Sequence, residues 1–164
     1  MIAVSVLIDD IDAAIDRVRR ASTPEEQRRA VKNALDELYS LRTYREAAHD
    51  DKLKKAYHRR SGATHAGQIA EGLSLVRGAK AHDALKDVDP RPRMLYPSAN
   101  LFPGENTYPG RQLIWRDAVE MGGLGLGKDK RRPYYDSVVA GQPALETLVQ
   151  ARNFLATDPG PCSP

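Results

Sequence analysis

The fold is decided by the stretch from Ser22 to His49, which reads STPEEQRRAVKNALDELYSLRTYREAAH. Thr23 is placed to cap a helix, Pro24 suits its first turn, and Glu26 completes a capping box. Apolar side chains then recur at helical spacing on one stripe. The stripe consists of Ala30, Val31, Ala34, Leu35, Leu38 and Leu41, and Tyr44 and Ala48 continue it. The sequence therefore predicts a long amphipathic helix from Pro24 to about His49.

Further helices are predicted on both sides of this stretch. Upstream, a helix over residues 7–21 has the stripe Ile8, Ile11, Ile15 and Val18. Downstream, a second helical piece is expected through residues 50–55, and Thr64 caps a third helix from His65 to about Lys86. Gly72 lies inside that helix and lowers its stability by about 1 kcal/mol relative to Ala. A glycine at such a position usually allows close packing or close ligand approach.

The second half of the chain differs from the first in composition and in hydrophobic pattern. Five prolines between Asp87 and Gly110 exclude a long helix and predict a wrapping arm or a flexible linker. Weak alternation predicts a strand over 111–119, followed by a short helix over 133–139 and a last amphipathic helix. We therefore expect a mainly α fold, an antiparallel helical bundle followed by a Pro-rich arm and a small α+β C-terminal appendage. The expected divisions are a helical domain over 1–88, the arm and appendage over 89–158, and a disordered tail over 159–164.

Composition restricts the compartment and the chemistry. The 164 residues carry a net charge of only +3, which permits an anionic partner without requiring one. The one cysteine, Cys162, excludes a disulfide or a Cys-based metal site within one chain. The apolar run over residues 1–8 is too short to span a bilayer and lacks a basic region before it. We expect a cytoplasmic protein with no membrane contact.

The pair Arg77 and His82 is the best candidate for chemistry. An arginine that keeps its proton and a histidine that loses one near neutral pH are the side chains that metal-free phosphodiester cleavage needs. A five-residue helical step leaves the two positions about 140° apart, so the pair fits best across two copies of the helix or around Gly78. The alternative is that Arg77 bonds to a neighbouring carboxylate and His82 half-covers the edge of the core.

Two other arginine–histidine pairs compete with it. Arg42 and His49 are about 700° apart on the long helix and so share a face. The alternative for this pair is a solvated helix face shared with Arg45 and Glu46. The second pair, Arg60 and His65, spans a predicted loop at Ser61-Gly62.

The stretch Arg77-Gly78-Ala79-Lys80-Ala81-His82 follows the apolar lead-in Leu73-Ser74-Leu75-Val76. It resembles the Arg-x(4–6)-His motif of the HEPN superfamily, and the resemblance covers about residues 8–88. The resemblance implies an all-helical homodimer in which the Arg and His of two protomers meet at a cleft and cut RNA without metal. From RNA chemistry, His82 would transfer protons at the 2′-hydroxyl or the leaving oxygen, and Arg77 would stabilise the charge on the phosphate.

A basic and aromatic segment is the candidate for RNA binding. Charged side chains interleaved with stacking rings suit single-stranded RNA, although a solvated loop before a helix is the alternative. The predicted RNA-binding residues are Lys80, Lys128, Lys130, Arg131, Arg132 and Tyr134. The preceding Gly-x4-Gly-Lys spacing over 122–128 imitates a phosphate-binding loop, but Asp129 stands where that loop needs Ser or Thr. We therefore expect a flexible loop there.

Metal and cofactor sites are not expected from the sequence. Three histidines lie near two aspartates, but no spacing among them matches a helical metal motif. These residues are His49, His58 and His65 with Asp50 and Asp51. We expect no metal and no cofactor.

The C-terminal half also resembles a group of uncharacterised actinobacterial proteins. The shared features are Trp115, the Tyr134-Tyr135 pair and the run Ala140-Gly141-Gln142-Pro143-Ala144-Leu145-Glu146-Thr147-Leu148. This resemblance implies an architecture and no activity.

Three functions are therefore open. The first is a metal-independent HEPN-type endoribonuclease, a homodimer in a toxin or antiphage setting with RNA and a protein antitoxin or regulator as partners. The second is a non-catalytic helical module that binds RNA, nucleotide or protein through the same surface. Gly78 favours the second, because catalytic members usually have a polar residue after the arginine. The third is a phage-encoded or structural interaction protein.

Overall fold

The computed structural model describes residues 4–47, 51–78, 84–88, 112–121 and 129–157. Within these ranges the fold is mainly helical with a single two-stranded sheet, which confirms the predicted mainly α class. The Pro-rich segment over 89–111 and the tail over 158–164 lie outside the described residues. Among the described helices, none combines the length and the apolar character needed to cross a membrane.

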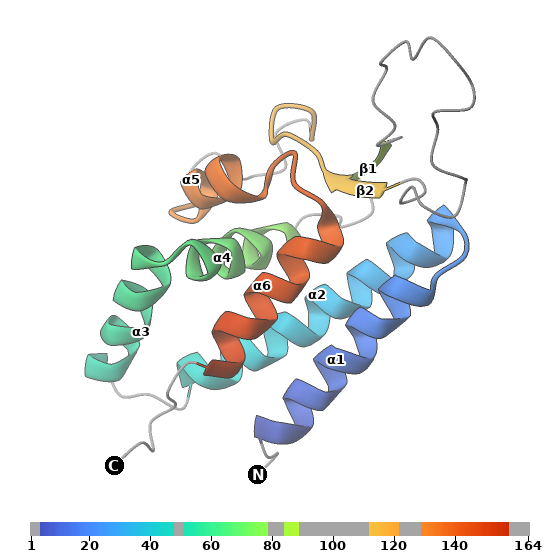
Figure 1. Cartoon of the computed structure of the whole chain (residues 1–164). Helices are drawn as coiled ribbons and strands as arrows, with labels where there is room; N and C mark the ends of the chain where they lie inside the picture. The colour runs from blue at the N-terminus through green and yellow to red at the C-terminus, as the bar shows by residue number, and fades with distance from the viewer. Residues whose placement is uncertain (1–3, 48–50, 79–83, 89–111, 122–128, 158–164) are drawn as a thin grey trace, which may run out of the picture.

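Helices α1 (Val4–Arg20) and α2 (Pro24–Ala47) run antiparallel, side by side (Figure 1). The capping box predicted at the start of α2 is confirmed. The backbone N–H of Glu26 donates to Thr23 Oγ1 at 3.2 Å, and the Thr23 N–H donates back to Glu26 Oε2 at 3.2 Å. Ser22 donates to the same carboxylate, and these hydrogen bonds from Ser22 and Thr23 lower the pKa of Glu26.

The two apolar stripes face each other, as the periodicity predicts. The buried residues are Ile11, Ala14, Ile15 and Val18 of α1, and Ala30, Val31, Ala34, Leu35, Leu38 and Leu41 of α2. Helix α1 begins three residues earlier than predicted, at Val4. Ile8 and Tyr44, at the ends of the predicted stripes, are partly exposed, and the rest of the described stripe residues are buried, so burial of apolar surface holds the long pair together.

Helices α3 (Asp51–Ala63) and α4 (His65–Gly78) meet at a tight corner. Thr64 caps α4 as predicted, since its Oγ1 accepts the Gly67 backbone N–H at 3.1 Å. A Cβ on Gly67 would lie 2.5 Å from the Ser61 carbonyl oxygen, so the corner requires glycine at this position. The second helical piece, predicted through 50–55, corresponds to the start of α3, which continues to Ala63.

The third predicted helix is wrong at its C-terminal end. α4 ends at Gly78, and Leu85–Val88 forms strand β1, although a helix was predicted to continue to Lys86. β1 pairs antiparallel with β2 (Gln112–Trp115), with Leu85 opposite Trp115. Pairing with a strand that is distant in sequence decides the conformation of these residues, and local periodicity contains no information about it. The strand predicted within 111–119 is confirmed.

The C-terminal elements pack against α4 and complete the hydrophobic core. A short helix α5 (Arg132–Tyr134) continues into the π-helical turn η4 (Tyr135–Val139), which confirms the short helix predicted there. Gly72 allows α4 to approach η4, because a Cβ at this position would lie 2.8 Å from Val139 Cγ2. The close packing predicted for this glycine is therefore present.

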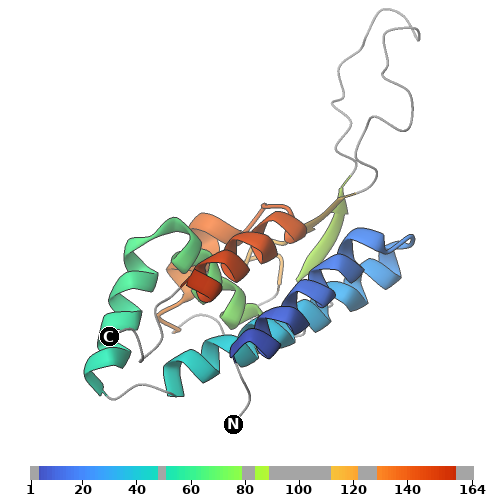
Figure 2. The ribbon, with the colours of Figure 1, turned by 60° about the horizontal axis from the view of Figure 1, so that its bottom comes forward.

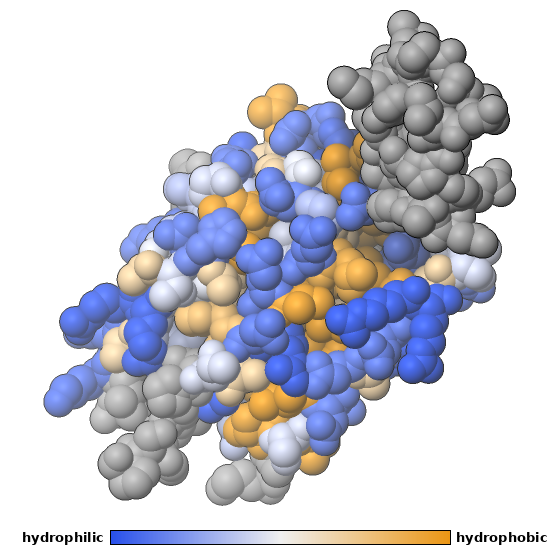
Figure 3. Space-filling model, viewed as in Figure 1, coloured by the Kyte–Doolittle hydropathy of each residue, from blue (hydrophilic) through white to orange (hydrophobic). Residues whose placement is uncertain are grey.

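The last helix, α6 (Ala144–Thr157), packs against α1, α2 and α4 (Figure 2). The Trp115 indole N–H donates to Thr147 Oγ1 at 2.7 Å and ties β2 to α6. Apolar side chains from both sides of position 88 contribute to one hydrophobic core. The division into 1–88 and 89–158 stays a prediction. Figure 3 shows a mostly hydrophilic surface over α1 and α6, with apolar atoms between the two helices.

Candidate functional site

The structure describes part of the predicted site. Lys80, His82 and Lys128 lie outside the described residues, as does His49 of the competing pair. The described members are Arg77, Lys130, Arg131, Arg132 and Tyr134. The geometry of the Arg77–His82 pair therefore stays a prediction.

Arg77 lies in the last turn of α4 and faces α2. Its Nε donates to Asp36 Oδ1 at 3.0 Å, and its guanidinium carbon lies 4.2 Å from the centroid of the Tyr39 ring. The predicted contact with a neighbouring carboxylate is thus present. The side chain is 42% exposed, and within the described ranges its two terminal nitrogens donate no hydrogen bond. The guanidinium is therefore held at one edge and open to an acceptor at the other.

The basic side chains of residues 130–132, just before η4, differ in whether a carboxylate pairs with them. Arg132 is engaged within its own helix, since its Nε donates to Asp136 Oδ2 at 2.7 Å. Arg131 makes a two-point contact with Asp129 and donates from Nη1 to Ser74 Oγ at 3.0 Å. The hydrogen bond from Arg131 is the main cause that lowers the pKa of Asp129 to about 2. Lys130 is exposed and, in the part of the chain that is described, has no carboxylate partner.

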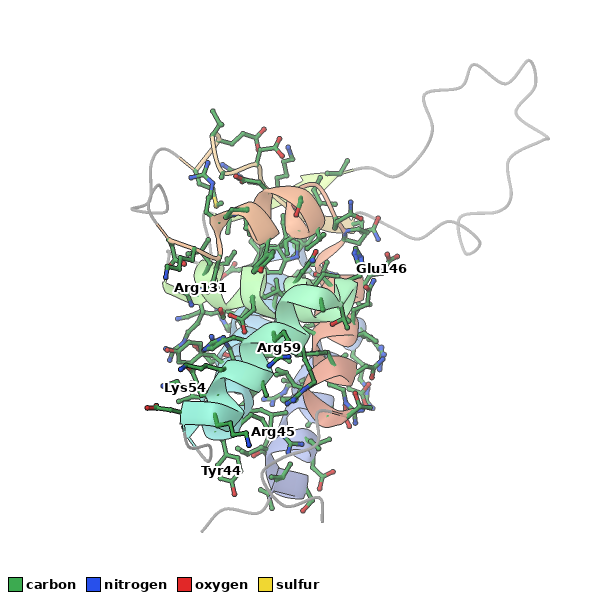
Figure 4. All side chains as sticks on the ribbon, turned by 90° about the vertical axis from the view of Figure 1, so that its left-hand side faces the viewer. Tyr44, Arg45, Lys54, Arg59, Arg131 and Glu146 are labelled. Carbon is green, nitrogen blue, oxygen red and sulfur yellow. The ribbon has the colours of Figure 1, made fainter. Side chains whose placement is uncertain are left out.

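Arg131 thereby lies close to the helix that carries Arg77. Ser74, which accepts the Arg131 hydrogen bond, precedes Arg77 by three residues on α4, a rise of about 4.5 Å. Positions three apart are neighbours on a helix surface. Figure 4 looks onto α3 and shows Arg131 beside α4, with Lys54 farther along the same face. The structure therefore brings one predicted RNA-binding arginine within about one helical turn of Arg77.

A buried ion cluster links α2 and α4, and the sequence did not predict it. Arg42 Nε donates to Glu71 Oε1 at 3.1 Å, and its Nη2 donates to Glu71 Oε2 at 2.9 Å. The third nitrogen, Nη1, donates to Glu46 Oε2 at 2.8 Å. The Tyr57 hydroxyl completes the cluster by donating to Glu71 Oε1 at 3.1 Å. His58 Nε2 lies 3.4 Å from the second oxygen of Glu46.

The solvated face predicted for Arg42 and Arg45 is therefore wrong. Arg42 is 8% exposed and Arg45 is 7% exposed, and Arg45 Nε has no hydrogen-bond partner among the described residues. Both residues continue the apolar stripe of α2, four and seven positions after Leu38, and this was the signal in the sequence. Burial alone would lower the pKa of Arg42, but the hydrogen bonds and negative charge of Glu71 raise it overall. Arg42 is therefore a permanently charged, paired group inside the bundle.

A polar cavity of about 700 Å³ opens beside this cluster. Arg42 and Glu71 contribute to its lining from α2 and α4, and His58 contributes from α3. The segment before η4 lines it with Asp129, Lys130, Arg131 and Tyr134. Three predicted RNA-binding residues thus converge on one hollow, and His58 and Glu71 are lining residues that sequence reasoning missed.

The second competing pair, Arg60 and His65, does not line this cavity. His65 begins α4 and is exposed, and Arg60 lies near the end of α3. Among the described residues there is no group of three or more His, Cys, Asp or Glu side chains arranged to hold a metal ion.

Comparisons of the chain with protein-family models, curated proteins and solved structures found no match.

Proposed function

We propose that this protein is a metal-independent endoribonuclease of HEPN type that acts as a homodimer in the cytoplasm. The single observation that carries the proposal is the setting of Arg77. Asp36 and the Tyr39 ring hold one edge of its guanidinium, and among the described residues the terminal nitrogens have no acceptor. A planar guanidinium with free terminal N–H groups matches the geometry of a phosphate.

The chemistry needs one proton-transferring group beside that arginine. His82 follows Arg77 by five residues and, with an unperturbed pKa near 6.5, suits proton transfer at a ribose 2′-hydroxyl or at the leaving 5′-oxygen. Attack of the 2′-oxygen on the adjacent phosphorus expels the 5′-oxygen and leaves a 2′,3′-cyclic phosphate. Arg77 stabilises the charge that develops on the phosphate oxygens. DNA lacks the nucleophile and is not a substrate of this reaction.

The RNA path in this proposal follows the basic segment. Arg131 contacts Ser74, which precedes Arg77 by about one helical turn, and Lys130 and Tyr134 line the same cavity as Arg131. Lys80 and Lys128 would add to the same positive surface. The biological setting that suits such an activity is a toxin or an antiphage system, with a protein antitoxin or regulator that restrains it.

The alternative function is a non-catalytic module that binds RNA, nucleotide or protein through this surface. The observation that favours it is the Asp36 contact, because a carboxylate beside Arg77 competes with phosphate for the same guanidinium. Gly78, in place of the polar residue of catalytic members, points the same way. The two functions differ in one readout, which is the formation of cleaved RNA.

The test is cleavage of total RNA by purified protein in EDTA, compared with His82→Ala. We expect EDTA-resistant cleavage that ends in 2′,3′-cyclic phosphates and is lost in His82→Ala. The matched control is His65→Ala, which removes an exposed histidine of the competing pair and should leave cleavage unchanged. RNA binding without cleavage by the wild-type protein would instead establish the non-catalytic alternative.

A further inference from the structure

The cavity beside the buried ion cluster has more hydrogen-bond donors than acceptors. Both carboxylates in its lining are already occupied. Glu71 accepts from Arg42 through both oxygens and also from the Tyr57 hydroxyl. Asp129 Oδ1 accepts from the backbone N–H and the Nε of Arg131, and Oδ2 accepts from its Nη2. Little acceptor capacity therefore remains to bind a cation.

The cations that line the cavity keep unused donors. A guanidinium carries five N–H groups, and Arg42 and Arg131 each donate through three nitrogens, one hydrogen bond per nitrogen, to side chains of the cluster. Among the described residues, one hydrogen on each terminal nitrogen of these two arginines has no acceptor. The ammonium of Lys130 adds three donors, with no carboxylate partner in the described part of the chain. The groups that lack partners among the described residues of the cavity are therefore cationic N–H donors, as in an anion-binding site.

The size and the aromatic wall identify the class of anion. A volume of about 700 Å³ lies in the range of pockets that hold small organic ligands, about 300–1,000 Å³, and is far larger than an inorganic ion needs. Tyr134 supplies the aromatic wall. Its hydroxyl lies 2.9 Å from the position a Cβ would take on Gly62, so the hydroxyl end of the ring approaches α3 closely.

We propose that this cavity binds a small organic phosphate monoester. The phosphate group lies against Lys130 and Arg131, and the organic body lies against the ring of Tyr134. Phosphate suits the site because several acceptor oxygens on one group can take the unused N–H donors of both side chains. The proposal shares Lys130, Arg131 and Tyr134 with the proposed RNA path, but it uses neither Arg77 nor His82, so its test does not depend on RNA cleavage.

The test is isothermal titration calorimetry with phenyl phosphate, inorganic phosphate and phenol as probes. We expect saturable binding of phenyl phosphate that is at least about tenfold tighter than binding of either of the other two, because neither satisfies both halves of the site. Lys130→Met should weaken the binding of phenyl phosphate by about tenfold or more, since a hydrogen bond to a charged group contributes about 1.5–3 kcal/mol. Tyr134→Leu should abolish the advantage of phenyl phosphate over inorganic phosphate.

The control is Lys32→Met, which removes the same charge from an exposed position of α2. Lys32 precedes Arg42 by ten residues, about 15 Å along the helix, and should leave binding unchanged. Equal affinity of Lys130→Met and wild-type protein would overturn the proposal. Binding of an RNA strand without saturable binding of phenyl phosphate would also overturn it, and neither readout requires cleavage of RNA.

Discussion

Two arginine–carboxylate pairs join α2 to α4, and they differ mainly in burial. Near the middle of α4, Arg42 of α2 contacts Glu71 at 2.9 Å, and the side chains are 10% and 5% exposed. At the end of α4 the partners are exchanged, since Arg77 of α4 contacts Asp36 of α2 at 3.0 Å with side chains 42% and 45% exposed. The contact distances are nearly equal, but Arg42 donates two hydrogen bonds to its carboxylate and Arg77 donates one.

That difference assigns the two pairs to different roles. Removing one partner of a buried pair leaves a charge without water or counter-charge, whereas an exposed pair contributes about 0–1 kcal/mol to stability. Arg42 therefore holds the bundle together, and its charge cannot be spared for a ligand without a cost in stability. In the proposed function, Arg77 would exchange Asp36 for a phosphate at little cost, as a group that binds and releases RNA needs.

The largest expected effect is on the buried pair. Arg42→Met should lower the free energy of unfolding by about 3–5 kcal/mol, because it leaves the buried Glu71 carboxylate without its paired cation. Urea denaturation followed by circular dichroism measures this change. The matched substitution Arg77→Met should cost less than about 1 kcal/mol. Equal losses in the two variants would contradict the distinction between the pairs.

The next effect concerns the hydroxyl that supports the buried pair. Tyr57→Phe removes the hydrogen bond to Glu71 Oε1 and keeps the ring, so we expect a loss of about 1.5–3 kcal/mol. The same denaturation experiment measures it. The control is Tyr39→Phe, where the ring that contacts Arg77 is retained. A Tyr57→Phe variant as stable as the wild type would show that Arg42 alone satisfies the carboxylate.

A smaller effect is expected from the exposed carboxylate. Asp36→Asn should change the free energy of unfolding by less than about 1 kcal/mol, and raised salt should reduce the difference further. Thermal unfolding at low and high ionic strength provides the measurement. A loss of unfolding free energy as large as that of Arg42→Met would instead show that the Arg77–Asp36 pair is needed to stabilise the fold.

The smallest effect is a change in pH dependence. Ionised Asp129 has a pKa of about 2, held below its ordinary 3.8 chiefly by the hydrogen bond from Arg131. Because the folded-state pKa is the lower one, this stabilisation is fully present above pH 3.8 and is lost as the pH falls through 2. Asp129→Asn should therefore lose less stability than the wild type over this interval. Parallel acid-unfolding curves for the two proteins would contradict the assignment.

The sequence was most informative where the determinants are local. Thr23 and Glu26 cap α2 within four residues of each other, and the apolar stripes of α1 and α2 recur within single helices. Leu85–Val88 was misassigned because its partner strand is distant in the chain.

For the site, the contact of Arg77 with a carboxylate was the alternative that the sequence left open beside a catalytic pair. The burial of Arg42 did not follow, because a charged residue on an apolar stripe indicates either a solvated edge or a paired ion. Only the position of Glu71 on another helix decides between them.

The most direct measurement is EDTA-resistant RNA cleavage by Arg77→Ala together with its free energy of unfolding. We expect cleavage to be lost while stability stays within about 1 kcal/mol of the wild type, because Arg77 is an exposed group that binds phosphate in the proposed function. Cleavage at the wild-type rate, or a loss of stability of the size expected for Arg42→Met, would contradict it.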